Sequence, residues 1–174
     1  MFQRLILFLG VAGEYDIHVA RSLDGGLNWG PTVTINPDRG LDHYFPAVDI
    51  VDRADRDRVG VSYYRSDRKF PGGSDYVLAG GANVSVPYNF KVVSPIFPPP
   101  DGSQASFNGD YSGLTINRGE EAHPIWSDTR NIDPYAPANG VIHDEDVFTD
   151  NVRLPAGVGS VGVGQIGKPN SDDQ

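Results

Sequence analysis

The side chains best suited to chemistry in this sequence are those of Tyr111, Trp126, Asp128 and Arg130. If Arg118 and the glycine after it form a two-residue hairpin turn, Tyr111 pairs with Trp126 across two short strands. Asp128 then lies diagonally on the same face, about 7 Å away, and Arg130 continues along that face. The four side chains could therefore form one cluster of polar and aromatic groups.

The side chains of such a cluster have distinct chemistries. Arg130 could hold a carboxylate bidentately, and Trp126 could stack on a sugar ring. A tyrosine hydroxyl, with an ordinary pKa of about 10, needs a neighbouring base before it can attack carbon. The plainer alternative, which we favour, is that Trp126 belongs to the core and that Asp128 and Arg130 form a salt bridge at a strand end. Asp110 would point to the face opposite Tyr111 if both lie in a strand.

The elements that must position these residues are predicted to be strands. The chain has 21 glycines and 14 prolines among 174 residues, and its apolar residues show no 3.6-residue period. Short strand-like segments separated by turn residues indicate an all-β sandwich, barrel or propeller. The predicted strands are residues 16–21, 32–35, 47–51, 59–64, 83–86, 114–116, 122–126 and 146–152.

An internal repeat favours the propeller. The pair of segments that contains Phe45 and Ser66 is echoed by a pair that contains Phe107 and Ser127, at offsets of 62 and 61 residues. A period near 60 with about four strands is close to that of a propeller blade. The predicted division is a half-blade at 1–36, a blade at 37–100, a final blade at 101–152 and a Gly-rich, polar tail at 153–174.

Residues 22–29, Ser-Leu-Asp-Gly-Gly-Leu-Asn-Trp, form the most specific motif. Ser22 and Asp24 can accept backbone hydrogen bonds across a tight turn, and Gly25 and Gly26 permit positive φ angles. Trp29 supplies a large apolar face that could pin the turn. The motif is therefore predicted to be a structural device.

With its Ser22, Asp24, Gly26 and Trp29 signature, this motif resembles the Asp box, or BNR repeat, of sialidase (neuraminidase)-like β-propellers. The resemblance covers about residues 15–152 and is to the C-terminal portion of that family. It implies an all-β, sialidase-type propeller with about two to two and a half blades in this chain. In that family the Asp box joins the outer two strands of a blade, away from the active site.

The resemblance also implies catalytic roles. Sialidases hold sialic acid at the propeller axis with three arginines, attack it with a tyrosine paired with a glutamate, and use an aspartate as the acid. The segment Asp110-Tyr111-Ser112 resembles the family's nucleophile segment. Tyr111 and Asp128 are therefore the candidate catalytic residues, and Arg130, Trp126 and Asp110 the candidate ligand-binding residues. The sequence identifies no counterpart of the family's N-terminal Arg motif, acid aspartate or partner glutamate.

We therefore favour a non-catalytic module that binds glycan or is a structural part of a propeller. The alternative is the C-terminal part of an exo-sialidase whose active site is completed by other sequence or another subunit. A third possibility is an unrelated all-β fold in which the box is a local turn. The expected partner is a glycan or sialoside, together with further copies of the chain or the remainder of a larger propeller. A net charge of -9 argues against nucleic acid.

The sequence predicts no cofactor and no metal site, because its four histidines lie in different segments without metal-ligand spacing. Residues 143–146 carry ligand types that calcium takes, but the favoured interpretation is a solvated acidic turn before the last strand. Residues 1–13 read either as a signal peptide or, as we favour, as a buried strand with its turn. No segment is long enough to span a membrane. We expect a secreted or cell-surface protein, and the composition leaves a cytoplasmic location open.

Overall fold

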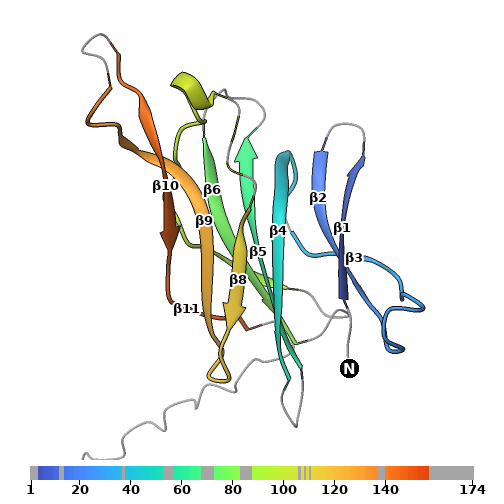
Figure 1. Cartoon of the computed structure of the whole chain (residues 1–174). Helices are drawn as coiled ribbons and strands as arrows, with labels where there is room; N and C mark the ends of the chain where they lie inside the picture. Colours follow the sequence, from blue (N-terminus) through green and yellow to red (C-terminus); the bar gives the residue numbers. More distant parts are fainter. Residues whose placement is uncertain are drawn as a thin grey trace, which may run out of the picture.

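A computed structural model describes residues 4–11, 14–36, 38–52, 57–67, 73–82, 88–105, 107, 109, 111–136 and 140–156. These residues form an all-β structure with one short 3-10 helix (Figure 1). None of them forms a helix long and apolar enough to cross a membrane. The elements are β1 (Arg4–Val11), β2 (Glu14–Arg21), β3 (Val33–Thr34), β4 (Leu41–Val51), β5 (Arg58–Asp67), β6 (Ser74–Gly81), β7 (Asn89–Val92), η1 (Gly102–Gln104), β8 (Gly113–Ile116), β9 (Glu121–Ile132), β10 (His143–Thr149) and β11 (Val152–Arg153).

The strands make three open antiparallel sheets. Sheet A has the order β1-β2-β3, and sheet B has the order β4-β5-β6-β7. In sheet C, β9 pairs with β8, β10 and β11. Ile125 of β9 pairs with both Gly113 and Thr149, so β8 and β10 lie on opposite edges of β9. The all-β prediction is confirmed, and the propeller stays a prediction.

Sheet B lies between the other two sheets. All eight residues of β6 and the first seven of β5 are buried. On one face, Val59, Val61 and Tyr63 pack with Ile17 and Val19 of sheet A. Because successive side chains of a strand point to opposite faces, the intervening residues of β5 and β6 face sheet C.

Two clusters join sheets B and C. Leu78 of β6 packs with Ile116 and Ala122, and farther along the same face Tyr64 packs with Trp126. Sheet B therefore has an apolar layer on each side. This explains why β6, which no alternating pattern marks, was not predicted from the sequence.

The sheets meet with their strands β2, β4 and β8 aligned in the same direction. Ser112, just before β8, donates a 2.8 Å hydrogen bond to the Phe45 carbonyl of β4. Four residues later in each chain segment, the N–H of Ile116 donates to Asp49 Oδ2 at 2.6 Å. The first residues of β4 and β8 therefore lie at one end of the stack, which we call the upper end.

Sheet A is aligned in the same way. The N–H of Tyr15, at the start of β2, donates to Asp42 near the start of β4. At the other end of β2, Arg21 forms a 3.5 Å ion pair with Asp57, in the connection that follows β4. The turn that follows β2, residues 22–29, therefore lies at the lower end of the stack.

Several predicted elements have different bounds in the structure. Of the eight predicted strands, the one at 83–86 falls outside the described residues, and β6 and β7 were not predicted. The interpretation of the first residues as a strand agrees with β1, which pairs with β2 along its whole length. Residues 143–146 belong to β10, so the predicted acidic turn is wrong. Leu154, placed in the predicted tail, is buried against sheet B.

Gly80 permits the close approach of the C-terminal segment to sheet B. A Cβ atom there would lie 2.2 Å from the carbonyl oxygen of Pro155 and 3.0 Å from Cγ of Leu154. We expect Gly80→Ala to lower the free energy of unfolding by about 2–3 kcal/mol, because backbone would have to move. Urea denaturation measures this, with Gly140→Ala as the control, since a Cβ there meets nothing within 4 Å. Equal stability of the two variants would contradict this packing.

Candidate functional site

The turn between β2 and β3 makes the hydrogen bonds that the sequence predicts. Ser22 Oγ accepts from the N–H of Gly26 at 2.8 Å and donates to Asp24 Oδ1 at 2.8 Å. Asp24 also accepts from the backbone and side-chain nitrogens of Asn28, at 2.9 and 2.6 Å. Hydrogen bonds from Asn28 and Ser22 lower the pKa of Asp24 to about 2. The φ angles of Gly25 and Gly26 are 77° and 94°, as expected for this turn.

Ser22 and Trp29 of this turn differ in burial, and the structural role predicted for the motif stays a prediction. Ser22 is fully buried and Trp29 is partly exposed. The residues of the turn line a shallow cavity of about 320 Å³ together with Arg21. The motif lies at the lower end of the stack, whereas the other candidate residues lie toward the upper end.

The predicted pairing of Tyr111 with Trp126 is wrong. Ile116 pairs with Ala122, and the N–H of Asn117 donates to the carbonyl of Glu121, so the turn consists of the three residues 118–120 instead of two. Its last residue, Glu120, has a φ of 66°, a conformation that few non-glycine residues adopt. A register shift of one residue moves a side chain to the other face of a sheet. Strand β8 also begins only at Gly113, and Tyr111, 89% exposed, lies before it.

Tyr64 of sheet B occupies the place next to β9 that Tyr111 was expected to fill. Its hydroxyl donates to the carbonyl of Ser127 at 2.9 Å and accepts from the N–H of Ser127 at 2.8 Å. Burial is the main cause that raises the pKa of Tyr64 well above its usual range, so the hydroxyl stays neutral. The sequence marked Tyr64 only as part of the repeat, because this contact joins two sheets.

Trp126, Asp128 and Arg130 do come together. Trp126, only 3% exposed, stacks on Tyr76 with ring centroids 5.0 Å apart. Asp128 is fully buried and accepts hydrogen bonds from the indole of Trp126 at 3.2 Å and from the backbone N–H and Nε of Arg130 at 2.9 Å each. The Arg130 guanidinium also lies 4.0 Å from the ring centroid of Phe148. This confirms the plainer alternative of a core tryptophan and a salt bridge. The catalytic role of Asp128 stays a prediction.

Tyr111 and Trp126 line a cavity of about 480 Å³, which we call the Tyr111 cavity. Ser127 Oγ donates a 2.6 Å hydrogen bond to Glu145 Oε1 within it. Ile125 and Val147 are 45% and 72% exposed beside this pair. Asp110, the remaining predicted site residue, falls outside the described residues. The cavity is lined by Gly109, Tyr111, Ser112, Gly113, Ile125, Trp126, Ser127, Glu145 and Val147.

Glu145 is a residue that the sequence reasoning did not assign to the site. It stands in the acidic stretch that was interpreted as a turn. Since 143–146 is part of β10, Glu145 and Val147 share one face of that strand, where both line the cavity. A strand pattern extended back to residue 143 would have been the signal.

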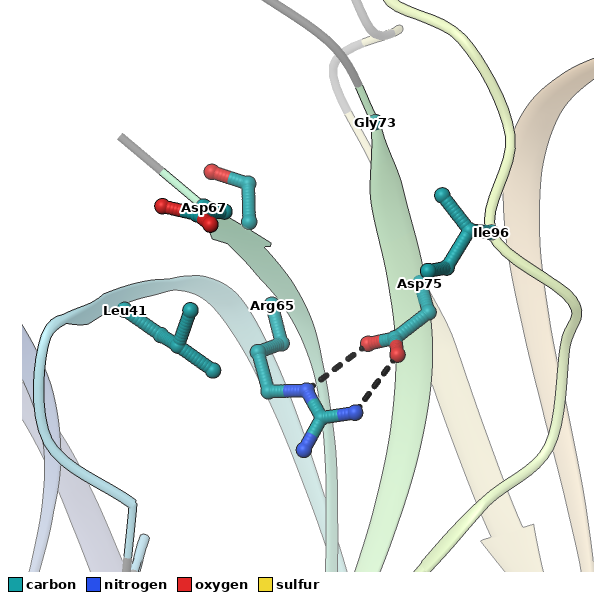
Figure 2. A pocket seen from close by; sticks show the side chains of 7 residues that line it. Leu41, Arg65, Asp67, Gly73, Asp75 and Ile96 are labelled. Carbon is teal, nitrogen blue, oxygen red and sulfur yellow. Dashed lines mark hydrogen bonds and ion pairs between the residues drawn. The ribbon is translucent and has the colours of Figure 1, made fainter. Parts of the chain in front are cut away.

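A third cavity, of about 320 Å³, lies around Arg65 at the ends of β5 and β6 (Figure 2). Figure 2 shows the Arg65 guanidinium facing the Asp75 carboxylate. Nε and Nη2 donate to Asp75 at 3.0 and 2.6 Å, and Nη1 donates to Asp38 at 2.9 Å. Hydrogen bonds to Asp75 are the largest cause that raises the pKa of Arg65 above its usual range. The lining residues are Leu41, Arg65, Ser66, Asp67, Gly73, Asp75 and Ile96.

Asp38 joins Arg65 to a buried histidine. His43 Nε2 lies 3.1 Å from Asp38 Oδ1, and His43 Nδ1 lies 3.1 Å from the carbonyl of Tyr15. Partial burial raises the pKa of Asp38, but hydrogen bonds from His43 and Arg65 outweigh it and lower the value to about 2. Arg65 is therefore held in one ionic network that links β4, β5 and β6.

The Arg65 cavity and the Tyr111 cavity differ in the kind of ligand that they could bind. No group of three or more His, Asp or Glu side chains among them is placed to hold a metal ion. The Arg65 cavity presents charges that are largely paired with each other. The Tyr111 cavity instead combines an exposed aromatic ring, hydroxyl groups and a carboxylate, which are groups that bind a polar organic molecule.

Comparisons with known proteins give no family. No protein-family model matches the chain, and neither a curated protein nor a solved structure matches it. The sialidase resemblance therefore stays a prediction that rests on the sequence motif and the repeat.

The contact between Tyr64 and Ser127 makes a testable contribution to stability. In Tyr64→Phe the part-buried N–H and carbonyl of Ser127 lose their partner, so we expect the free energy of unfolding to fall by about 1–2 kcal/mol. Tyr135→Phe is the matched control, because Tyr135 is 92% exposed. Urea denaturation of both variants measures the difference. An unchanged Tyr64→Phe would show that the hydroxyl does not bridge the two sheets.

Proposed function

We propose that this chain is a non-catalytic module of a sialidase-like β-propeller and that it binds carbohydrate in the Tyr111 cavity. The observation that carries the proposal is the composition of that cavity. An exposed tyrosine ring lies beside a serine and a glutamate that are fixed on neighbouring strands of sheet C. Aromatic rings stack on the apolar faces of sugars, and carboxylates accept hydrogen bonds from their hydroxyl groups.

The stacked sheets support the propeller part of the proposal. In a propeller, each inner blade has a neighbour on both faces, as sheet B has here. The aligned strands β2, β4 and β8 lie side by side, and the hairpins β4–β5 and β8–β9 correspond to the two halves of the sequence repeat. The turn at residues 22–29 joins the last two strands of sheet A, at the lower end of the stack.

The dimensions of the cavity also suit a sugar. A volume of about 480 Å³ lies within the range of small-molecule sites. Ile125 and Val147 give it an apolar wall, and Ser112, Ser127 and Glu145 give it hydrogen-bonding groups. A sugar ring presents both kinds of surface. The cavity could therefore hold one or two sugar units.

The burial and the hydrogen bonds of Asp128 favour a non-catalytic role for the chain. Its carboxylate is fully buried and already accepts hydrogen bonds from Trp126 and Arg130. A general acid or base must reach the substrate directly or through one water molecule. Asp128 therefore serves to position Arg130 and Trp126 in this proposal.

One observation favours the alternative, that the chain supplies part of an exo-sialidase site. Tyr111 and Glu145 line the same cavity, and the family's mechanism needs a tyrosine with a glutamate partner. A fluorogenic sialoside assay distinguishes the two proposals. We expect no turnover by the isolated chain. Turnover that disappears in Tyr111→Phe would establish the alternative.

The open sheets also indicate that the chain associates with a protein partner. Ile125 and Val147 expose apolar surface on the outer face of sheet C, whereas the corresponding faces of sheet B are covered. Unpaired strand edges and apolar faces favour association. We therefore propose that further copies, or the remainder of a larger propeller, pack against this chain. A sheet that packs over the outer face of sheet C would compete with sugar for the Tyr111 cavity.

Loss of the aromatic ring should weaken sugar binding. We expect the chain to bind at least one glycan on an array of mono- and oligosaccharides. Tyr111→Ala should weaken that binding by about tenfold or more, since an aromatic contact contributes roughly 0.5–1.5 kcal/mol in addition to the effect of the apolar area that it buries. Saturation-transfer NMR gives the affinity in solution. Tyr135→Ala is the control, because Tyr135 is equally exposed but does not line the cavity. Equal binding by the two variants would refute the assignment of this site.

A further inference from the structure

We infer that the Tyr111 cavity selects uncharged and amino sugars over acidic ones. This inference rests on the proposed function and names its ligand class. Among the described residues that line the cavity, Glu145 carries the one formal charge. From the lining residues that the structure describes, the ligand therefore meets a carboxylate and no guanidinium or ammonium group.

Arg130 is the cation nearest in sequence that could have held an acidic sugar, and its guanidinium is committed elsewhere. Its Nε donates to Asp128 at 2.9 Å, and Nη2 contacts the same carboxylate oxygen. The guanidinium also lies over the ring of Phe148. Phe148 and Trp126 pack with the cluster between sheets B and C. Arg130 accordingly lies outside the residues that line the cavity.

The described arginines at the other end of β9, Arg118 in the turn before it and Arg153 of β11, are distant along the strand. Arg153 of β11 pairs with Glu121 at the first residue of β9. Ser127, in the cavity, lies six residues farther along β9. At about 3.3 Å per residue this separation is roughly 20 Å, about two Debye lengths at ordinary ionic strength. Arg153 cannot offset the charge of Glu145.

The Glu145 carboxylate is fixed in position. Ser127 Oγ donates to Oε1 at 2.6 Å, and the backbone of Ser127 is held by the Tyr64 hydroxyl in two hydrogen bonds. No described residue donates to Oε2. That oxygen is therefore placed to accept a hydrogen bond from a ligand hydroxyl, or a stronger one from a ligand ammonium group.

The Glu145 carboxylate would repel a ligand carboxylate. Two like charges about 4–5 Å apart at a protein surface repel each other enough to weaken binding by about tenfold or more. An ammonium group on the same sugar ring gains from the same charge. Sugars that differ in a single group should therefore bind in the order amino, neutral and acidic.

The experiment compares glucosamine, glucose and glucuronic acid, and the three matching galactose compounds, by saturation-transfer NMR at neutral pH. We expect glucosamine or galactosamine to bind about tenfold or more tightly than the corresponding uronic acid. In Glu145→Gln, which keeps the hydrogen bond from Ser127, the ratio should fall to about two or three. Glu121→Gln, at the far end of β9, should keep the ratio of the unchanged chain.

A second measurement does not depend on a variant. In the unchanged chain, the preference for the amino sugar should shrink when the salt concentration is raised from about 0.01 M to about 1 M. A uronic acid that binds as tightly as its amino sugar would overturn this inference and leave the proposed function in place. If none of the six sugars binds, and no glycan on the array binds either, both this inference and the proposed function are refuted.

Discussion

The burial of sheet B on both faces is the interaction on which the rest of the structure depends. Strands β5 and β6 contribute apolar side chains alternately to sheet A and to sheet C, and each fully buried large side chain contributes roughly 1.5–3 kcal/mol. Gly60 and Gly80, which pair with each other, permit Ile116 and Leu154 to lie close to the sheet. Sheets A and C each gain their buried face from this contact. Neither sheet would have a core without it.

The Tyr111 cavity opens on the outer face of sheet C, but its groups are held from the interior. Tyr64 crosses from sheet B to satisfy the backbone of Ser127, and Ser127 in turn holds the carboxylate of Glu145. Tyr76 supports Trp126 from the same side. A change deep in sheet B can therefore alter the cavity without touching a ligand.

Local features could be predicted from the sequence, and contacts between distant segments could not. The hydrogen bonds that Ser22 and Asp24 accept in the turn at 22–29 were predicted, because they join residues two to four positions apart. Strand β6 was missed because both of its faces are buried, so it shows no alternation. The register predicted for β8 was wrong by one residue, because Glu120 adopts a positive φ that a non-glycine residue seldom takes. That shift and the late start of β8 removed the pairing of Tyr111 with Trp126, although both residues line the Tyr111 cavity. Glu145 was missed because the acidic residues around it resemble a turn more than a strand.

The central claim is that sheet B is the shared core that fixes the other two sheets. Native-state hydrogen exchange, followed residue by residue by NMR, tests it most directly. The amides of β5 and β6 should exchange slowest, at the rate set by global unfolding, and those of the edge strand β10 should exchange faster through local opening. If the amides of β6 exchange as fast as those of β10, sheet B is not buried between two sheets, and the account is contradicted.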